Sequence, residues 1–456
     1  MIRLPKETIL ELDLLQELLA EHDHEVRRFK RLRDAYETRH DIFDIPKRDD
    51  WKPDNRIAVN FPKYITDTFE GFFIGNPIKV VADDDAVAEY VEHLDKYNDQ
   101  DDNNAELSKL GSMFGKGYEL YFTDEEAEQC ITYMTPEESF MVYDDSVVES
   151  PLFFVRRFKD RDGNEYGCAY DRTGYRNFKI TGGAQWLDED WVEHHYSGVP
   201  ASEFMQNEER LGIFEPVMSM VNAYNKAVSE KANDVDYFAD AYLKILGVAL
   251  DEESAKHIRK NRIINFEGED SDKLVVEFMA KPEGDTTQEN LLDRMERLIY
   301  QISMVANISD ENFGTSSGIA MKYKLQAMSN LAKTKERKFT SGMNRRYKLL
   351  FGHPASKVPA DAWMQLEYKF TPNIPANHLE EAQNAAQLEG IVSKETQLKI
   401  LSIVDNVQEE LEKIEEESEA AAETAVDRAM FGTPVAEETP ETETVEVNAD
   451  ETQKES

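Results

Sequence analysis

Apolar side chains recur at helical spacing near the start of the chain. Together with the mixed-charge run that follows them, they predict one or two surface helices over residues 6–39. The apolar positions are Ile9, Leu12, Leu15, Leu18 and Leu19. A further helix is predicted after Asn60 and Pro62, which are typical of a helix start, and before the turn at Gly75-Asn76-Pro77.

Residues 114–200 follow a different pattern. Aromatic and β-branched residues form short runs there, separated by turn signals such as Asp162-Gly163. Such runs are typical of strands, so we expect a small antiparallel sheet or a barrel-like unit.

Three long helical patterns come next. The first covers residues 216–247 and the second 286–306, and the intervening residues 248–285 predict a short helix flanked by apolar strands. The third covers residues 318–351, well above the mean helix length of about 11–12 residues. Gly314 and its Ser and Thr neighbours predict a loop between the second and third helices.

The C-terminal part combines three predicted features. Residues 363–370 predict a strand, and residues 377–418 predict a helical hairpin in which Ser393 is an N-cap and Thr396 replaces the usual Glu. Residues 419–456 are acidic and nearly free of large apolar side chains, so we expect disorder. The predicted fold class is α+β, mainly α.

Composition limits what the chain binds. At 456 residues, two or more packed regions are expected. The net charge of −40 opposes adhesion to DNA over the whole surface, because such binding needs Lys and Arg to neutralise phosphates. With two cysteines, no run of about 18 apolar residues and an acidic amphipathic N-terminus, we expect assembly in a reducing cytoplasm and neither secretion nor membrane insertion.

The sequence contains only weak signals for a catalytic or metal-binding site. His194-His195 lies close to several acids, but adjacent residues on a strand point apart. His22 and His24 occupy different helix faces, so we expect them to be solvated surface residues and not a pair of ligands. Gly115-Lys116-Gly117 lacks the spacing of a phosphate-binding loop and indicates turn geometry. We therefore expect no cofactor, no metal and no enzymatic activity.

Several segments, read in order, resemble the portal proteins of long-tailed bacteriophages. They are NFPKYITDTFEGFFIGNPIKV, the stretches YDDS and YGCAYD, PVMSMVNAYNKAVSEKANDVDYFADAYLKILG, ISMVANISDENFGTSSGIAMKYKLQAM, and FTPNIPANHLEEAQNAAQLEGIVSKETQL. The resemblance covers roughly residues 50–415. It implies the portal fold and a ring, usually of twelve copies, around an axial channel.

The same resemblance assigns regions to this chain. It implies a wing over residues 1–215, stem helices over 216–247 and 286–306, and a clip over 248–285. It also implies a long wing helix and strand over 318–376 and a crown over 377–418. The implied clip residues that dock terminase or connector proteins are Asp251, Glu252, Lys256, Arg259, Lys260 and Arg262.

Between the second stem helix and the long wing helix, the resemblance implies a tunnel loop at the narrowest point of the DNA channel. Its residues are Asn307, Ile308, Ser309, Asp310, Glu311, Asn312, Phe313, Gly314, Thr315, Ser316 and Ser317. The loop contains acids and no Lys or Arg, which fits a wall along which DNA slides.

The third long helix is locally basic, with Glu336 as the only acid among its bases. The bases are Lys322, Lys324, Lys333, Lys335, Arg337, Lys338, Arg345, Arg346 and Lys348. Two interpretations stay open at this point, namely pairing with acids of neighbouring subunits and a surface that faces DNA.

The expected partners follow from the resemblance. They are further copies of the chain, double-stranded DNA bound without sequence preference, terminase, the major capsid and scaffolding proteins, and head-completion (adaptor) proteins. The expected location is one capsid vertex of the virion. An acidic helical scaffold or adaptor protein is the main alternative, and a hydrolase whose acids converge only in space is a third.

Overall fold

The computed structural model describes residues 2–49, 52–239, 243–246, 275–278, 285–309, 318–374 and 378–418, the last range with gaps at 402, 405–406 and 409. The chain divides into two compact units, Met1–Ile374 and Pro375–Ser456, and each is described by itself. The predicted clip residues 251–262 and tail residues 419–456 lie outside the described residues.

Seven strands of the described N-terminal unit form one sheet in the order β1-β5-β6-β7-β8-β10, with β9 paired to β8. They are β1 (Ile2–Leu4), β5 (Ser139–Asp144), β6 (Pro151–Lys159), β7 (Glu165–Tyr170), β8 (Gly174–Ile180), β9 (Ala184–Trp186) and β10 (Val192–Glu193). The antiparallel pairing predicted for residues 114–200 is confirmed for β5 to β8. Strand β1 was not predicted and pairs with β5 in parallel.

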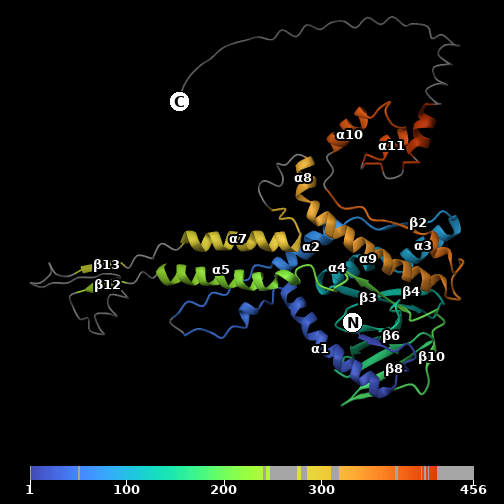
Figure 1. Cartoon of the computed structure of the whole chain (residues 1–456), viewed down its shortest axis with the longest axis horizontal. Helices are drawn as coiled ribbons and strands as arrows, with labels where there is room; N and C mark the ends of the chain where they lie inside the picture. Colours follow the sequence, from blue (N-terminus) through green and yellow to red (C-terminus); the bar gives the residue numbers. More distant parts are fainter. Residues whose placement is uncertain are drawn as a thin grey trace, which may run out of the picture. The chain divides into compact units, whose positions relative to one another are not determined.

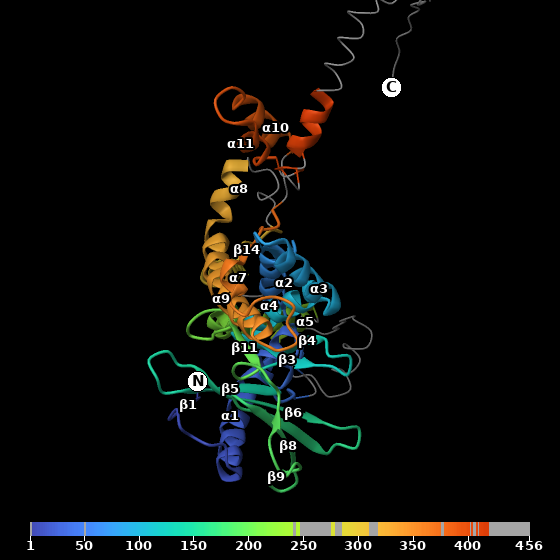
Figure 2. The same ribbon diagram turned by 90° about the vertical axis from the view of Figure 1, so that its right-hand side faces the viewer.

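A second, three-stranded sheet lies between the large sheet and the helices α4 (Gln100–Phe114) and α9 (Gln326–Phe351) (Figure 2). Its order is β11-β3-β4, from β11 (Ala201–Met205), β3 (Lys116–Thr123) and β4 (Gln129–Met134). Helix α4 (Gln100–Phe114) leads directly into β3 through Gly115, whose φ of 87° is the left-handed conformation that glycine accommodates. The turn predicted at Gly115 is thus confirmed.

Helix α1 (Leu12–Tyr36) covers the large sheet. Its side chains Leu15, Leu18 and Leu19 share a core with Phe140 and Phe178, so one continuous helix replaces the one or two predicted. Burial of one face of this helix includes His22, which is only 3% exposed. The predicted solvated surface for His22 is therefore wrong, because the sheet covers the face on which this residue lies.

Three shorter helices and one short strand follow α1 in the chain. They are η1 (Asp41–Phe43), α2 (Phe61–Phe73) and, after β2 (Lys79–Val81), α3 (Asp85–Tyr97). The predicted start of α2 is confirmed, because the side chain of Asn60 accepts a hydrogen bond from the Lys63 amide at 2.9 Å.

Two long helices, α5 (Met218–Ala239) and α7 (Asp285–Ser303), extend side by side from the body of the N-terminal unit (Figure 1). Helix α5 follows η2 (Glu215–Val217). The predicted extension of α5 to residue 247 is wrong, since Leu243–Leu246 is a strand, β12, paired antiparallel with β13 (Val275–Phe278). Pairing with β13 satisfies backbone groups that a continued helix would have bonded internally.

The third predicted helix is present with one interruption. It consists of α8 (Gly318–Lys324) and α9 (Gln326–Phe351), which are separated at Leu325. After η4 (Ala362–Gln365), the predicted strand shortens to β14 (Glu367–Lys369), which pairs with β2. In the C-terminal unit, α10 (His378–Gln387) is followed by α11 (Lys394–Leu398), and Ser393 caps α11 as predicted.

Candidate functional site

Aromatic side chains join the paired helices α5 and α7 to α2. Phe61 of α2 lies edge-on to Tyr224 of α5 and to Tyr300 of α7, at centroid distances of 5.0 and 5.8 Å. Tyr64 of α2 contacts Tyr300 in the same way at 5.6 Å. Such edge-to-face pairs add specific geometry to apolar burial, so these rings define how the helix pair leaves the unit.

An extended segment before α2 is fastened along α5 by side-chain hydrogen bonds. The amides of Asn55, Ile57 and Val59 donate to the side chains of Asn233, Ser229 and Asn225 at 2.6, 2.9 and 2.8 Å. The three acceptors are at most 4% exposed. Every second residue of an extended chain advances about 6.7 Å, close to the roughly 6 Å that four helical residues advance. We call this ladder the polar zipper.

The predicted tunnel loop begins against this junction. The Ile308 amide donates to the Tyr64 hydroxyl at 3.0 Å, and the Asn307 side chain donates to Glu296 of α7 at 3.4 Å. The Ser309 amide donates to Asn307 Oδ1 at 3.1 Å. The loop's first residues are thus held by α2 and α7, while its residues 310–317 lie outside the described residues.

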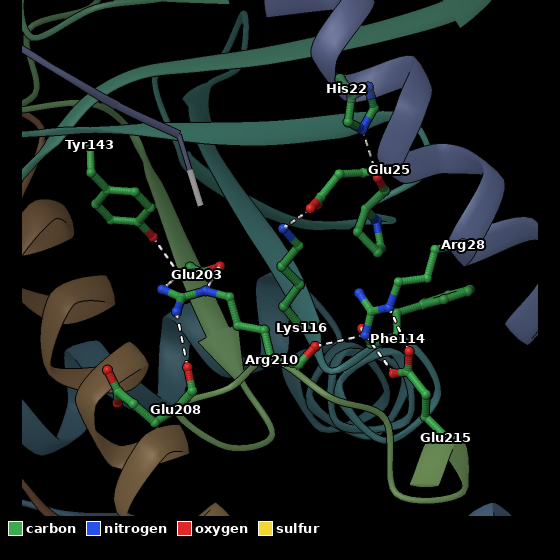
Figure 3. A network of polar contacts seen from close by, with 11 residues as sticks. His22, Glu25, Arg28, Phe114, Lys116, Tyr143, Glu203, Glu208, Arg210 and Glu215 are labelled. Carbon is green, nitrogen blue, oxygen red and sulfur yellow. Dashed lines mark hydrogen bonds and ion pairs between the residues drawn. The ribbon is translucent and has the colours of Figure 1, made fainter. Parts of the chain in front are cut away.

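A polar network holds η2, the short helix just before α5, to α1 (Figure 3). The Arg28 guanidinium donates to both carboxylate oxygens of Glu215, at 2.6 and 2.5 Å, and also to the Arg210 carbonyl at 2.9 Å. Glu215 in turn accepts from the Gly212 amide at 3.1 Å. A two-pronged Arg–carboxylate contact fixes orientation as well as distance, so α1 is locked to η2, which leads directly into α5.

The same network continues into the sheets. Arg210 contacts Glu203 of β11 through two hydrogen bonds of 2.9 and 2.8 Å, and Tyr143 of β5 donates to Glu203 at 2.5 Å. Burial opposes the charge of Glu203, but the contacts with Arg210 outweigh it and lower the pKa of this carboxyl. Glu203 therefore remains ionised and joins the two sheets.

Two bases of the locally basic helix α9 point into the unit. Lys335 is 1% exposed and donates to Glu70 of α2 at 2.6 Å, with burial lowering its pKa. Arg346 donates to both carboxylate oxygens of Glu119 on β3, at 2.8 and 2.6 Å, and both side chains are fully buried. These two bases are therefore occupied by acids of their own subunit.

The remaining predicted bases have mixed placements. Lys338 pairs with Glu208 of the same chain, and Arg345 donates to the backbone carbonyls of Ala201 and Val199 at 3.0 Å each. The exposed members on α8 and α9 are Lys322, Lys324, Lys333, Arg337 and Lys348. The two interpretations, DNA or a neighbouring subunit, stay predictions for these exposed bases.

The sequence did not predict the polar zipper or the Arg28–Glu215 contact. Asn225, Ser229 and Asn233 recur every four residues, which places them on one helix face, and this spacing was the available signal. Their backbone partners could not be predicted, because the segment around Ile57 lies about 170 residues away in sequence.

Two searches of the described residues bear on other functions. No group of three or more His, Cys, Asp or Glu side chains is arranged there to hold a metal ion. Nor is any helix in the described ranges both long and apolar enough to cross a membrane.

Comparison with known proteins gives consistent matches along the chain. The model of the family described as "Phage portal protein, SPP1 Gp6-like" matches residues 15–424. The chain is 26% identical over 450 residues to the portal protein of Bacillus phage SPP1, covering 90% of this chain and 87% of that protein. It is 23% identical over 389 residues to the portal protein of Clostridium phage phiCD119, covering 79% of this chain and 84% of that protein.

Proposed function

The chain belongs to the family of SPP1 Gp6-like phage portal proteins, and we propose from this membership that copies of it form a ring at one capsid vertex. Double-stranded DNA enters and leaves the capsid through the centre of this ring. The role is structural and needs no catalytic group. The number of copies that we propose is twelve.

The observation that carries this proposal is the anchored helix pair. Helices α5 and α7 project together. Their base is fixed by the aromatic contacts between Tyr300 and α2, by the polar zipper and by the Arg28–Glu215 contact. A pair held so firmly can act as one wall element of a channel, because neither helix can swing independently of the unit. We infer that α5 and α7 are the stem helices.

The segment after α7 fits the tunnel loop in this proposal. Asn307–Ser317 carries Asp310 and Glu311 and no base, so it offers DNA phosphates no strong contact. Such a loop contacts moving DNA without gripping it. Replacing residues 310–317 by a Pro-rich segment is expected to impair packaging or retention of DNA, and unchanged packaging and retention would exclude this role.

Partner docking is assigned to the region between the stem helices. We propose that the clip, residues 248–285, docks the terminase during packaging and the connector proteins afterwards, through the charged residues between Asp251 and Arg262. The ring is then incorporated in the virion together with the major capsid and scaffolding proteins. Charge reversal at Lys256 and Arg259 is expected to weaken terminase binding in a pull-down while leaving ring mass unchanged.

Native mass spectrometry with negative-stain imaging of the same sample tests the ring. A closed ring of about twelve copies with an axial hole is the expected result. A small or irregular oligomer would instead favour the acidic scaffold or adaptor function, for which no channel is needed. That second function has no specific structural observation in its favour.

A further inference from the structure

The loop between β5 and β6 presents two valines to solvent. Val147 is 104% exposed and Val148 is 81% exposed, relative to a fully accessible residue. Isolated exposed apolar residues are common on protein surfaces, but two adjacent ones at the tip of an ordered loop form an apolar knob. We call residues 145–149 the valine loop.

The valine loop is built to hold its shape. Asp144, at 1% exposure, accepts hydrogen bonds from the amide and hydroxyl of Ser146 at 3.3 and 2.5 Å and from the Ser150 amide at 2.9 Å. Arg172 pairs with the same carboxylate at 3.0 Å. Glu149 has a φ of 51°, a left-handed conformation that is costly for a residue with a side chain. The surrounding contacts therefore impose the loop conformation.

The N-terminal strand braces the same loop from one side. The Asp145 amide donates to the Leu4 carbonyl at 2.9 Å, and Arg3 pairs with Glu149 at 2.5 Å. A loop held in this way loses little conformational freedom when it binds, so burial of its valines would contribute directly to affinity.

A hollow of about 350 Å³ lies where α1 meets η1 and α5. Arg27, Lys30 and Arg31 line it from one exposed helix face. Their spacing of three and four residues brings like charges together, and within the described residues no acid pairs with any of the three. Buried Ala35 and Met218 add apolar surface to the same hollow.

Three acids also line the hollow, and their contacts decide which charge a partner must carry. Asp34 pairs with Arg39 at 2.8 Å, and Asp41 accepts from Asn222 at 2.7 Å, while Asp44 completes the acidic lining. Two of the three acids are thus already engaged, whereas the three bases of α1 form no ion pair within the described residues, although Lys30 also interacts electrostatically with Glu137 over a longer distance. The α1 wall therefore favours an acidic partner.

We propose that the valine loop of one copy inserts into this hollow on the adjacent copy. Val147 and Val148 then lie against Ala35 and Met218, and Asp145 faces the bases of α1. Asp145 is exposed and has no ion pair in the described part of the chain, so it is free to do so. The inference rests on the proposed ring.

Complementary surfaces on the same chain identify a second copy as the occupant of the hollow. An acidic loop with an apolar tip requires a basic hollow with some apolar lining, and this chain carries both although its net charge is −40. Because knob and hollow are different surfaces, the contact is head-to-tail, and such a contact generates a ring when the rotation between neighbouring copies closes on itself.

Site-specific cross-linking tests the contact directly. A full-length Val148→Cys/Arg31→Cys variant in a Cys130→Ser background is oxidised under native conditions, with native mass spectrometry of the same sample. The expected result is a ladder of linked subunits on a denaturing gel, absent from either single variant. The matched control Val148→Cys/Glu89→Cys, with its second thiol on the exposed face of α3, is expected to give no ladder.

Charge exchange supplies a second measurement. Asp145→Lys is expected to raise the concentration needed for ring formation at least tenfold, and Asp145→Lys with Lys30→Glu and Arg31→Glu is expected to restore it. Rings that form without a ladder and tolerate Asp145→Lys would overturn this contact but leave the proposed function standing. Absence of rings from the unsubstituted chain would instead overturn the ring, and this contact with it.

Discussion

Buried ionisable side chains are the main residue-scale feature of the N-terminal unit. Arg346, Glu119, Lys335 and His22 are all buried, and Glu70, the partner of Lys335, is 12% exposed. A buried charge is stable only when a partner compensates its lost hydration, so removal of one partner is more damaging than removal of both. His22 differs, because burial keeps it neutral.

Removal of Arg346 alone tests this asymmetry. We expect Arg346→Met to lower the free energy of unfolding by about 3–5 kcal/mol, because Glu119 is left buried without its cation. Arg346→Met with Glu119→Leu is expected to recover most of the loss. Urea titrations followed by tryptophan fluorescence measure both variants. The control is Glu92→Gln, which removes the exposed Glu92–Lys96 pair and should not change stability measurably. If Arg346→Met and Glu92→Gln changed the free energy of unfolding equally, burial of the Arg346–Glu119 pair would not matter for stability.

The pH dependence of stability tests His22. Burial lowers the pKa of His22 to about 4, from 6.5, and its ring lies 2.8 Å from the Pro136 carbonyl. Above pH 6.5 the side chain is neutral in both states, and as pH falls toward 4 only the unfolded chain binds the proton. Stability attributable to His22 is therefore lost on acidification, by about 2 kcal/mol at pH 5.

His22→Gln should lack this component of the pH dependence. Urea titrations of both proteins at pH 7.5 and pH 5 isolate it, because other groups contribute equally to the two. Parallel losses in the two proteins would show that His22 titrates normally.

At the element scale, the polar zipper explains why a long helix can leave the unit at a fixed angle. Asn225, Ser229 and Asn233 would be poor choices for a buried helix face if they packed against apolar side chains. Here each satisfies a backbone amide of the extended segment that precedes α2. The helix thereby supplies the hydrogen bonds that a neighbouring strand would supply in a sheet.

Ser229→Ala tests the zipper. The substitution leaves the Ile57 amide without its acceptor, and we expect a loss of about 1–3 kcal/mol in the free energy of unfolding. Faster hydrogen exchange at Ile57 than in the unsubstituted protein is the local readout. Lys226→Ala changes an exposed residue of the same helix and is the matched control. Unaltered exchange at Ile57 would mean that water replaces the hydroxyl without cost.

At the scale of the whole molecule, the net charge is that of a protein that DNA can pass without being bound tightly. A chain with a net charge of −40 repels phosphates, and some of its bases, among them Lys335 and Arg346, are paired with acids of the same subunit and are not exposed to DNA. In the proposed ring, we therefore expect the channel to enclose DNA without binding it tightly.

Fluorescence anisotropy with a labelled duplex measures this property. At about 0.15 M salt we expect a dissociation constant larger than the roughly 10⁻⁴ to 10⁻⁶ M that is typical of non-specific DNA-binding proteins. Tight binding that weakens steeply with added salt would indicate an exposed basic surface, and the exposed bases Lys333 and Arg337 would be the first to substitute.

The sequence by itself determined most of what depends on neighbouring residues. Helix α2 begins after Asn60 and ends before Gly75, the chain turns at Gly115, and Ser393 caps α11, all as predicted, whereas helix α4 before Gly115 was not predicted. The long helices followed from apolar spacing, and the order of these segments was sufficient to indicate the portal family. These features are local, because capping, turns and helical periodicity involve residues within a few positions of one another.

Only the tertiary structure decided which polar residues are buried and what they contact. His22 meets Pro136, Arg346 meets Glu119, and Ile57 meets Ser229, across separations of 114, 227 and 172 residues. No local pattern distinguishes such residues from solvated ones, because the charge or amide looks the same in sequence whether water or a distant partner satisfies it. The choice is made when the elements pack, since packing removes water and leaves each polar group to the partner that the fold provides.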